Sequence, residues 1–396
     1  MLTAQTQTVP TSGRALTYAA YISFIPIGIA TVLLGPMLPI LSARWSMNDA
    51  QAGALFPAQY VASTLAVAIS GMVVSRWGYR FAINCGLTLM AIGVAFLLSG
   101  PKMVGVLCIG AYGAGLGLAV PAANLLVAAA NPQHRSATLN LLNFYWSMGA
   151  VACPTLVGAA ERSAHITLFL RSVAMLAVVV AIGIGLMRGN LAEPVADRSP
   201  VLPIIQKHWR GFAILGVLFF LYVGVENGFG QWMASYVKGL GTLPLAVALA
   251  TPSFFYFSLM IGRWIAPALL RVLDDVKLAQ TGLVLSSLGM AGLMFSRGLP
   301  SIAASAIAAG LGLSSVYPIT ISLLSREFSS AKVGSLMFVL TNIGGGLLPW
   351  MVGISSTRFG TLKAGLYVPL LGCLMMYFFY LQNWIRSNPS ADDSRG

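Results

Sequence analysis

The stretch MVGVLCIGAYGAGLGLAVPAANLLVAAA, residues 103–130, decides the fold class of this chain. It has 28 residues and no charged side chain, and about 20 apolar residues are enough for a helix to cross the hydrocarbon core of a bilayer. Its central Ala114-Gly-Leu-Gly-Leu118 recurs as Ala309-Gly-Leu-Gly-Leu313 in a second apolar run. Small residues inside an apolar helix let neighbouring helices approach, so helix packing explains these glycines better than phosphate binding. The pattern indicates a membrane protein with an internal repeat.

The composition of the whole chain agrees with this interpretation. Of 396 residues, 57% are hydrophobic and 8% are charged, with a mean hydropathy of +0.82, whereas about a quarter of the residues of a soluble domain are charged. A soluble enzyme is therefore excluded, and the lipid bilayer is the expected surrounding. At roughly 30 residues for one span and its loop, the chain holds about a dozen spans. We expect an all-α integral membrane protein with twelve transmembrane helices near residues 16–41, 51–75, 81–99, 103–130, 136–159, 166–187, 211–236, 243–270, 278–296, 300–324, 333–356 and 364–385.

The placement of lysine and arginine predicts the orientation of these helices. The formal net charge is +13, but the cations lie singly between apolar runs and form no stripe, so no nucleic-acid partner is expected. Connections on the side of the two termini carry about twice as many cations as the others, and cation-rich connections are cytoplasmic. Both termini are therefore predicted to be cytoplasmic. The localisation that follows is the bacterial inner membrane, as a multi-pass protein.

The longest polar stretch, Arg188 to Arg210, divides the spans six and six. It predicts an N-terminal six-helix bundle over residues 1–190, a cytoplasmic linker over 191–210 and a C-terminal six-helix bundle over 211–396. Sliding the sequence by 195 positions aligns the two halves and matches pairs such as Arg76 with Arg271, Gly149 with Gly344, Pro154 with Pro349 and Gly158 with Gly353. Two pseudo-symmetric bundles with a central site are typical of carriers that work by alternating access.

Glu226 is the one acidic residue inside a predicted span. A carboxylate is costly in hydrocarbon and usually faces the interior of the bundle. Because burial favours the neutral form, Glu226 is a candidate both for substrate binding and for carrying a coupling proton. The alternative is a carboxyl group that locks helices together against an arginine or a tyrosine.

Polar residues in several spans form a second set of substrate-binding candidates. In the fifth span Asn140, Asn143 and Ser147 share one helix face, with Trp146 beside them. The further candidates are Gln59, Tyr60, Asn124, Asn227, Gln231, Trp232, Tyr317 and Asn342. Amides bind hydroxyl groups and indoles stack on C–H surfaces, as a neutral sugar-like solute needs. The alternatives are hydrogen bonds between helices and an aromatic belt at the membrane interface.

Catalysis and metal binding have no support in the sequence. His134, His165 and His208 lie in separate connections, and no paired carboxylates or nucleophile–base set is found within the spans. The four cysteines lie in apolar runs without C-x-x-C spacing, so neither a metal site nor a disulfide framework is indicated. We expect no catalytic residue and no cofactor.

The segment Gly71-Met-Val-Val-Ser-Arg-Trp-Gly-Tyr-Arg80, between the second and third spans, resembles the cytoplasmic loop motif of the major facilitator superfamily. Four other segments are similar to the fucose permease-like sugar permeases of that superfamily: Phe56-Pro-Ala-Gln-Tyr60, Leu139-Asn-Leu-Leu-Asn143, Tyr222-Val-Gly-Val-Glu226 and Gly344-Gly-Gly-Leu-Leu-Pro-Trp350. The resemblance implies the major facilitator fold and a monomeric transporter.

The same resemblance implies a cytoplasmic gate. Gly71, Arg76, Gly78 and Arg80 match the motif, and Ser75 stands where the family has an acid. The corresponding gate residues expected in the second half are Arg263, Arg271 and Asp274. The carboxylates that proton-coupled members of this branch carry in the first and fourth spans are missing here. Coupling then falls to Glu226 or to another ion such as Na⁺, or the protein is a facilitator.

The function expected from these residues is transport of a small neutral polar solute, a monosaccharide or a polyol, coupled to protons or Na⁺ or facilitative. Three alternatives stay open. The first is an exporter of amphipathic drugs or metabolites. The second is an organic-anion carrier that uses Arg171 and Arg263. The third is a solute sensor that does not transport.

Overall fold

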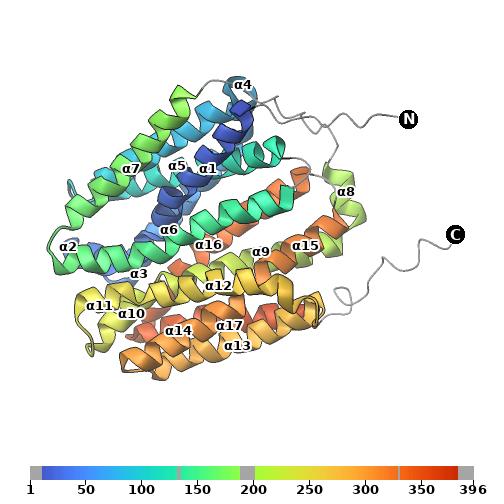
Figure 1. Ribbon diagram of the computed structural model, residues 1–396. Coiled ribbons are helices and arrows are strands. Elements are labelled where there is room, and N and C mark those ends of the chain that lie inside the picture. Colours follow the sequence, from blue (N-terminus) through green and yellow to red (C-terminus); the bar gives the residue numbers. More distant parts are fainter. Residues whose placement is uncertain (1–10, 132–134, 188–200, 329–330, 382–396) are drawn as a thin grey trace, which may run out of the picture. The chain divides into compact units, whose positions relative to one another are not determined.

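The computed structural model describes residues 11–131, 135–187, 201–328 and 331–381, and these are helical with no strand (Figure 1). The predicted linker therefore lies partly outside the described residues, as do both termini. The helices in chain order are α1 (Thr11–Val32), α2 (Leu34–Arg44), α3 (Asp49–Gly53), α4 (Leu55–Ala95), α5 (Lys102–Ala130), α6 (Arg135–Arg162), α7 (Ile166–Leu186), α8 (Val201–Lys207), α9 (Trp209–Gly230), α10 (Met233–Leu240), α11 (Leu245–Ala250), α12 (Pro252–Leu269), α13 (Asp275–Phe295), α14 (Leu299–Leu313), α15 (Val316–Glu327), α16 (Ala331–Phe359) and α17 (Leu362–Tyr380).

Ten helical segments of the described chain are long and apolar enough to cross a membrane. One of them, Asp49–Ala95, is counted once, although Gly78 interrupts α4 with a φ of 83° and a ψ of 167°. A positive φ suits glycine, because it lacks the Cβ that would clash. Helix α6 has 28 residues but a more polar composition, and it is not among the ten. The all-helical membrane architecture is thus confirmed, and the number of twelve spans stays a prediction.

The chain forms two compact units. Unit 1 comprises Met1–Thr31, Ala62–Ala152 and Ile166–Ala196, and unit 2 comprises Val32–Val61, Cys153–His165 and Asp197–Gly396. Residues 32–61 and 153–165, which belong to the predicted N-terminal bundle, thus lie in unit 2. The division into six-helix bundles over 1–190 and 211–396 stays a prediction. Helices α2 and α3 lie in unit 2, α2 against α10 and α11, and α3 against α16.

Close contacts at glycine hold the helices of each unit together, and they support the internal repeat. In unit 1 an added Cβ on Gly149 would lie 2.1 Å from the backbone oxygen of Ile25. In unit 2 an added Cβ on Gly344 would lie 2.0 Å from the backbone oxygen of Phe220. Both members of the second pair follow those of the first by 195 positions. The repeat found in the sequence is therefore also a repeat of helix contacts.

The repeated Ala-Gly-Leu-Gly-Leu segments show the same packing with the roles of their glycines exchanged. In α5, Gly115 packs against Gly86 and Gly117 against the backbone of Ser63. In α14, it is Gly312 that packs against Gly282, while Gly310 faces Phe255 and Ser258 on α12. The α5 segment thus contacts the parts of α4 on both sides of Gly78, and the α14 segment contacts α12 and α13. Small residues allow this close approach in membrane bundles.

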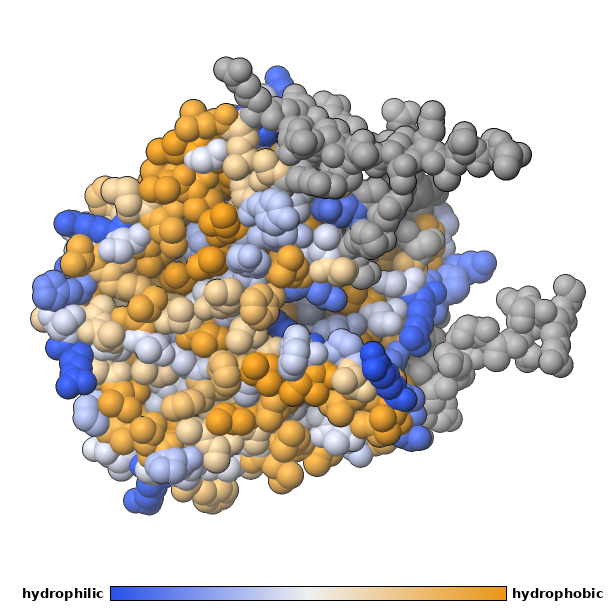
Figure 2. All heavy atoms as spheres, viewed as in Figure 1, coloured by the Kyte–Doolittle hydropathy of each residue, from blue (hydrophilic) through white to orange (hydrophobic). Residues whose placement is uncertain are grey.

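The outer surface of unit 2 is apolar. Helices α13 and α17 expose large apolar side chains, and Figure 2 shows apolar residues over most of the visible face in this region. The exposed ones on these two helices are Val284, Leu285, Leu288, Phe295, Tyr367, Leu371, Leu374, Met375 and Phe378. Continuous apolar exposure of this extent is expected of a surface that faces lipid.

Candidate functional site

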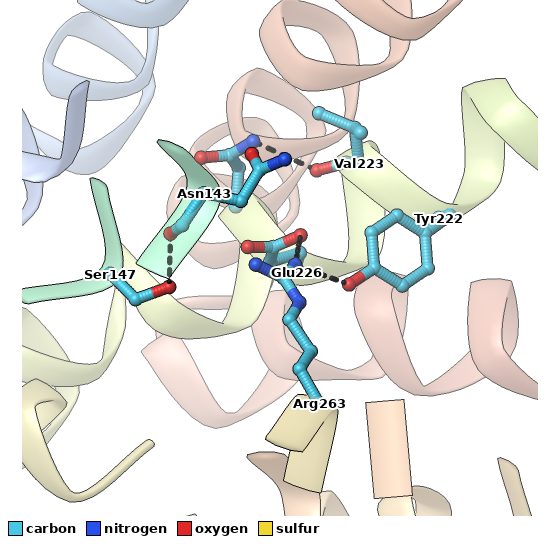
Figure 3. Close-up of polar contacts among 7 residues, drawn as sticks. Asn143, Ser147, Tyr222, Val223, Glu226 and Arg263 are labelled. Atoms are coloured by element: carbon cyan, nitrogen blue, oxygen red, sulfur yellow. Dashed lines mark hydrogen bonds and ion pairs between the residues drawn. The ribbon is translucent and has the colours of Figure 1, made fainter. Parts of the chain in front are cut away.

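Glu226 on α9 is 8% exposed and lies beside a half-buried arginine. Nη2 of Arg263, on α12, is 3.8 Å from Oε2 of Glu226 (Figure 3). Arg263 also donates a hydrogen bond of 3.2 Å to the hydroxyl of Tyr222, and this hydroxyl interacts in turn with the Glu226 carboxylate. The carboxylate predicted from the sequence is therefore part of a buried triad in which its charge is compensated.

Three more tyrosines surround this triad. The ring of Tyr317, on α15, stacks on Tyr222 at a centroid distance of 5.0 Å. Tyr60, on α4, is hydrogen-bonded to the side chain of Asn227, and Tyr256, on α12, interacts electrostatically with Glu226 and Tyr60. The glycines of α16 make room for Tyr60, because an added Cβ on Gly345 would lie 2.6 Å from its ring. The structure thus brings four predicted residues together in unit 2: Glu226, Asn227, Tyr60 and Tyr317.

The polar cluster continues along the membrane span beyond Glu226. Gln231 and Trp232 join α9, which ends at Gly230, to α10, which begins at Met233, and both residues keep helical backbone angles. Nε2 of Gln231 is 2.5 Å from Oδ1 of Asn227. This hydrogen bond extends the polar cluster from Glu226 to Gln231.

Trp232 has a different environment from the other predicted residues. It is fully buried, and its indole N–H donates a 2.8 Å hydrogen bond to the backbone oxygen of Pro349. The centroid of its ring lies 6.1 Å from that of Phe56. The ring also packs against Gly53 and Gly353, where an added Cβ would lie 3.4 Å and 3.1 Å from it. Trp232 therefore packs α10 against α3 and α16. Two other candidates of unit 2 lie on neighbouring helices: Gln59 is buried on α4 and Asn342 is half-buried on α16.

The remaining substrate-binding candidates lie in unit 1. The side-chain amides of Asn143 and Asn124 donate to carbonyl oxygens of their own helices, at 3.0 Å and 2.8 Å. Trp146 donates to the Thr31 hydroxyl at 3.3 Å, and Ser147 donates to the backbone of Asn143 at 2.9 Å. Asn140 is exposed on the same helix. A role of these unit 1 residues in substrate binding stays a prediction.

The predicted gate motif of the first half is structured around the break in α4. Arg80, just after Gly78, donates a 2.7 Å hydrogen bond to the backbone oxygen of Gly185 near the end of α7. Arg76 lies over the ring of Trp77 at 5.0 Å. Gly71 has open space around it. The Ser75 hydroxyl bonds Met72 of its own helix, so it does not replace the ionic contact of an acid.

The expected gate residues of the second half have separate roles. Arg263 belongs to the Glu226 triad. Asp274 caps α13, because the Lys277 backbone N–H donates to its carboxylate at 2.8 Å and lowers the pKa of that carboxyl group. Arg271 is exposed. Asp274 also pairs with the Lys277 ammonium at 3.2 Å, and next to it Asp275 of α13 pairs with Arg326 of α15 at 2.8 Å.

Three residues that make contacts at the candidate site or between α3 and α16 were not predicted from the sequence. Tyr222 was noted only within a family-like segment, and Tyr256 had no signal because aromatic residues abound in apolar spans. Asp49 stood out only as an acid outside the spans. In the structure its carboxylate accepts a hydrogen bond from the Ser356 hydroxyl of α16, at 2.5 Å.

The α3–α16 contact, formed by Asp49, Ala50 and Gly53 with Gly353, Ser356 and Thr357, brings two backbones together without a long side chain between them. An added Cβ on Gly353 would lie 2.3 Å from the backbone oxygen of Asp49, and the Ala50 N–H donates to Thr357 at 2.8 Å. An equivalent contact joins the end of α6 to α11, since a Cβ on Gly158 would lie 2.3 Å from the Ala246 oxygen. Gly158 and Gly353 were matched by the repeat.

If transport requires the α3–α16 contact to open, a covalent link across it stops transport. We expect the double variant Asp49→Cys with Ser356→Cys to lose transport about tenfold or more on oxidation, and to recover it when a reductant cleaves the disulfide. Each single variant serves as the control, because it has no partner thiol at this contact. Solute flux into proteoliposomes is the measurement, and undiminished flux in the oxidised double variant would show that this contact stays closed.

Comparison with known protein families identifies the family of this chain. A sequence profile of the Major Facilitator Superfamily matches residues 20–353. The chain belongs to this superfamily. The assignment made from the Gly71–Arg80 segment is thereby confirmed, and major facilitator proteins are membrane transporters of small molecules rather than enzymes.

Relatives and solved structures similar to this chain cover nearly all of it. A TsgA homolog of Yersinia enterocolitica is 22% identical over 385 residues, which are 92% of this chain and 95% of that protein. The E. coli fucose:proton symporter FucP is 20% identical with a TM-score of 0.64, covering 94% of this chain and 98% of its own. The nucleoside transporter NupG is 14% identical with a TM-score of 0.75, covering 94% and 99%. At these identities the two structures support the major facilitator fold.

Proposed function

We propose that this protein is a proton-coupled major facilitator transporter of a small neutral polar solute, a monosaccharide or a related polyol. The observation that carries the proposal is the buried Glu226–Arg263–Tyr222 triad, surrounded by tyrosines and side-chain amides. FucP, a fucose:proton symporter, and NupG, a nucleoside transporter, share the fold, and their named solutes also carry hydroxyl groups.

The triad supports coupling because Glu226 has two balanced states. When ionised, it is compensated by Arg263 at 3.8 Å. When protonated, it leaves the guanidinium to the Tyr222 hydroxyl, at 3.2 Å. Because the distance of 3.8 Å is longer than a close hydrogen bond, neither state is locked by ideal geometry. If the proton affinity of Glu226 differs between two conformations of the transporter, proton binding shifts the equilibrium toward the conformation with the higher affinity.

The surroundings of the triad support a hydroxylated solute. Tyrosine hydroxyls and amides from α4, α9, α12 and α15 offer both donors and acceptors, and the aromatic faces offer apolar contact. The charges of Glu226 and Arg263 cancel, so the described part of the cluster carries no net charge. A neutral solute leaves this balance intact.

An organic-anion carrier is the second candidate, and one observation favours it. Arg263 is a half-buried cation in a membrane span, and protonation of Glu226 would free it to pair with a carboxylate. This reading predicts that proton binding and anion binding occur together. The same transport experiment separates the two candidates.

The test is uptake of labelled solutes into proteoliposomes that contain the purified protein, with and without an imposed pH gradient. We expect at least one monosaccharide from a panel of hexoses, pentoses and polyols to accumulate several-fold above equilibrium when the gradient is present. Collapse of the gradient with a protonophore is the control, and Na⁺ replaces the proton gradient in a parallel set. Gradient-driven accumulation of dicarboxylates without sugar flux would establish the anion carrier. Flux of neither class, together with drug sensitivity on deletion of the gene, would establish the exporter.

The proposed site of action is the bacterial inner membrane, with the protein working as a monomer in the lipid bilayer. Its relatives in Yersinia support a bacterial membrane, and the apolar surface of α13 and α17 supports direct contact with lipid.

A further inference from the structure

Tyr256 carries a buried hydroxyl group that has no hydrogen-bond partner among the described residues. The side chain, on α12, is 3% exposed, and its oxygen is fully enclosed and unpaired. The hydroxyl lies close to Gly230 of α9, since an added Cβ on Gly230 would lie 2.8 Å from Oη. A buried hydroxyl without a partner has lost its hydrogen bonds to water with no compensation, and such groups in native proteins commonly serve a ligand or an ordered water.

Gln231 presents a second unpaired atom, and the orientation of its amide is determined by a chain of hydrogen bonds. Nδ2 of Asn227 donates to the Val223 carbonyl at 2.9 Å, so Oδ1 of Asn227 is an acceptor. Nε2 of Gln231 donates to that acceptor, which leaves Oε1 of Gln231 buried with no partner in the described chain. The unpaired atom is an oxygen that can only accept.

Both unpaired groups belong to the Glu226 cluster. Tyr256 lies against Gly230, the residue that precedes Gln231. Gln231 is hydrogen-bonded to Asn227, and Asn227 is hydrogen-bonded to Tyr60. The two atoms are thus linked through Tyr60 and Asn227 to the residues on which the proposed function rests.

We propose that Tyr256 and Gln231 determine the solute specificity of this transporter by binding hydroxyl groups of the solute directly. Tyr256 donates its hydroxyl hydrogen to a solute oxygen, and Oε1 of Gln231 accepts from an O–H or N–H group of the solute. A solute that offers only acceptors, such as a dicarboxylate, leaves Oε1 of Gln231 unpaired. The inference rests on the proposed transport function and narrows its substrate to solutes that carry both donors and acceptors.

The test compares Tyr256→Phe with a matched control, Tyr236→Phe. Tyr236 is equally buried, at 5% exposed, but its hydroxyl already donates to the Met294 carbonyl at 3.2 Å. Without solute, we expect Tyr256→Phe to unfold at the same temperature as the wild type or higher, because it removes an unpaired group. We expect Tyr236→Phe to unfold at a lower temperature, because it leaves a carbonyl without its donor.

In sugar binding, measured with the monosaccharide panel, the expected order is reversed: Tyr256→Phe is the impaired variant and Tyr236→Phe is not. Tyr256→Phe binds the preferred sugar about tenfold more weakly, a loss of about 1.4 kcal/mol, whereas Tyr236→Phe keeps the wild-type affinity. Gln231→Met is expected to weaken binding by a similar factor. The loss is expected to be largest for a sugar that the wild type binds much more tightly than the corresponding deoxy sugar. Binding is measured by calorimetry on the purified full-length protein.

Two results would overturn the inference. One is a Tyr256→Phe variant that loses stability without solute as Tyr236→Phe does, since the hydroxyl would then have a partner within the protein. The other is unchanged sugar affinity in Tyr256→Phe and Gln231→Met. If wild type binds no sugar of the panel, the proposed function fails, and the unfolding temperatures still decide whether the Tyr256 hydroxyl is unpaired.

Discussion

Replacing Glu226 by Gln is expected to reduce pH-gradient-driven accumulation at least about tenfold, to the level of passive equilibration. The substitution keeps the size and hydrogen-bonding capacity of the side chain but removes the group that gains and loses a proton. Exchange of labelled for unlabelled solute across the membrane is expected to continue, because it does not require net proton movement. Both rates are measured on the same proteoliposomes.

Glu161→Gln is the matched control for this prediction. Glu161 lies near the end of α6, outside the predicted spans, so its neutralisation is expected to leave accumulation unchanged. Full uphill accumulation in Glu226→Gln would refute a coupling role for this carboxyl group and would leave its contact with Arg263 as a structural lock between α9 and α12.

The partner of Glu226 allows a second comparison within the same experiment. Arg263→Gln leaves a carboxyl group buried without its cation, and breaking a buried ion pair costs about 3–5 kcal/mol of stability. The double variant with Glu226→Gln is expected to recover much of that loss, since it removes both charges. Denaturant unfolding in detergent measures the recovery, and strictly additive losses would show that the two side chains do not interact.

Replacing Gly344 by Ala is expected to destabilise the protein by about 3 kcal/mol, the upper part of the range for overpacking. The added Cβ would lie 2.0 Å from the backbone oxygen of Phe220, and backbone atoms cannot rotate away as a flexible side chain does. Helices α9 and α16 must therefore separate, which also displaces the helix that carries Glu226. The measurement is the free energy of unfolding in detergent, with solute flux as the second readout.

Gly334→Ala on the same helix α16 is the control, since nothing lies within 4 Å of the Cβ it adds. Alanine favours helix over glycine by about 0.5–1 kcal/mol, so this variant is expected to be as stable as wild type or more stable. The repeat extends the prediction to Gly149→Ala, whose Cβ would lie 2.1 Å from the Ile25 oxygen. Equal stability of Gly344→Ala and Gly334→Ala would contradict the close approach of α9 and α16.

The sequence by itself determined the membrane architecture, the internal repeat and the central carboxyl group. Apolar helices such as residues 103–130 are stable with an exposed face only in lipid. Gly149 and Gly344 stand at equivalent positions because the two halves use the same helix contact. Glu226 was identifiable because a carboxylate in hydrocarbon is costly and needs a reason to be retained.

The tertiary structure alone decided which groups compensate that carboxylate and which remain unpaired. The contact of Arg263 with Glu226 was not predicted, because only the packing of α12 against α9 brings the two side chains together; a role of Arg263 in a cytoplasmic gate stays a prediction. Tyr256 and Gln231 are distinguished by unpaired atoms, a property of three-dimensional surroundings that no periodicity encodes. In an apolar chain, hydropathy reports the solvent of each helix but does not report which faces of two helices meet. Hydrogen-bond pairing in the interior depends on that meeting, so it follows from the fold and not from the pattern of residues.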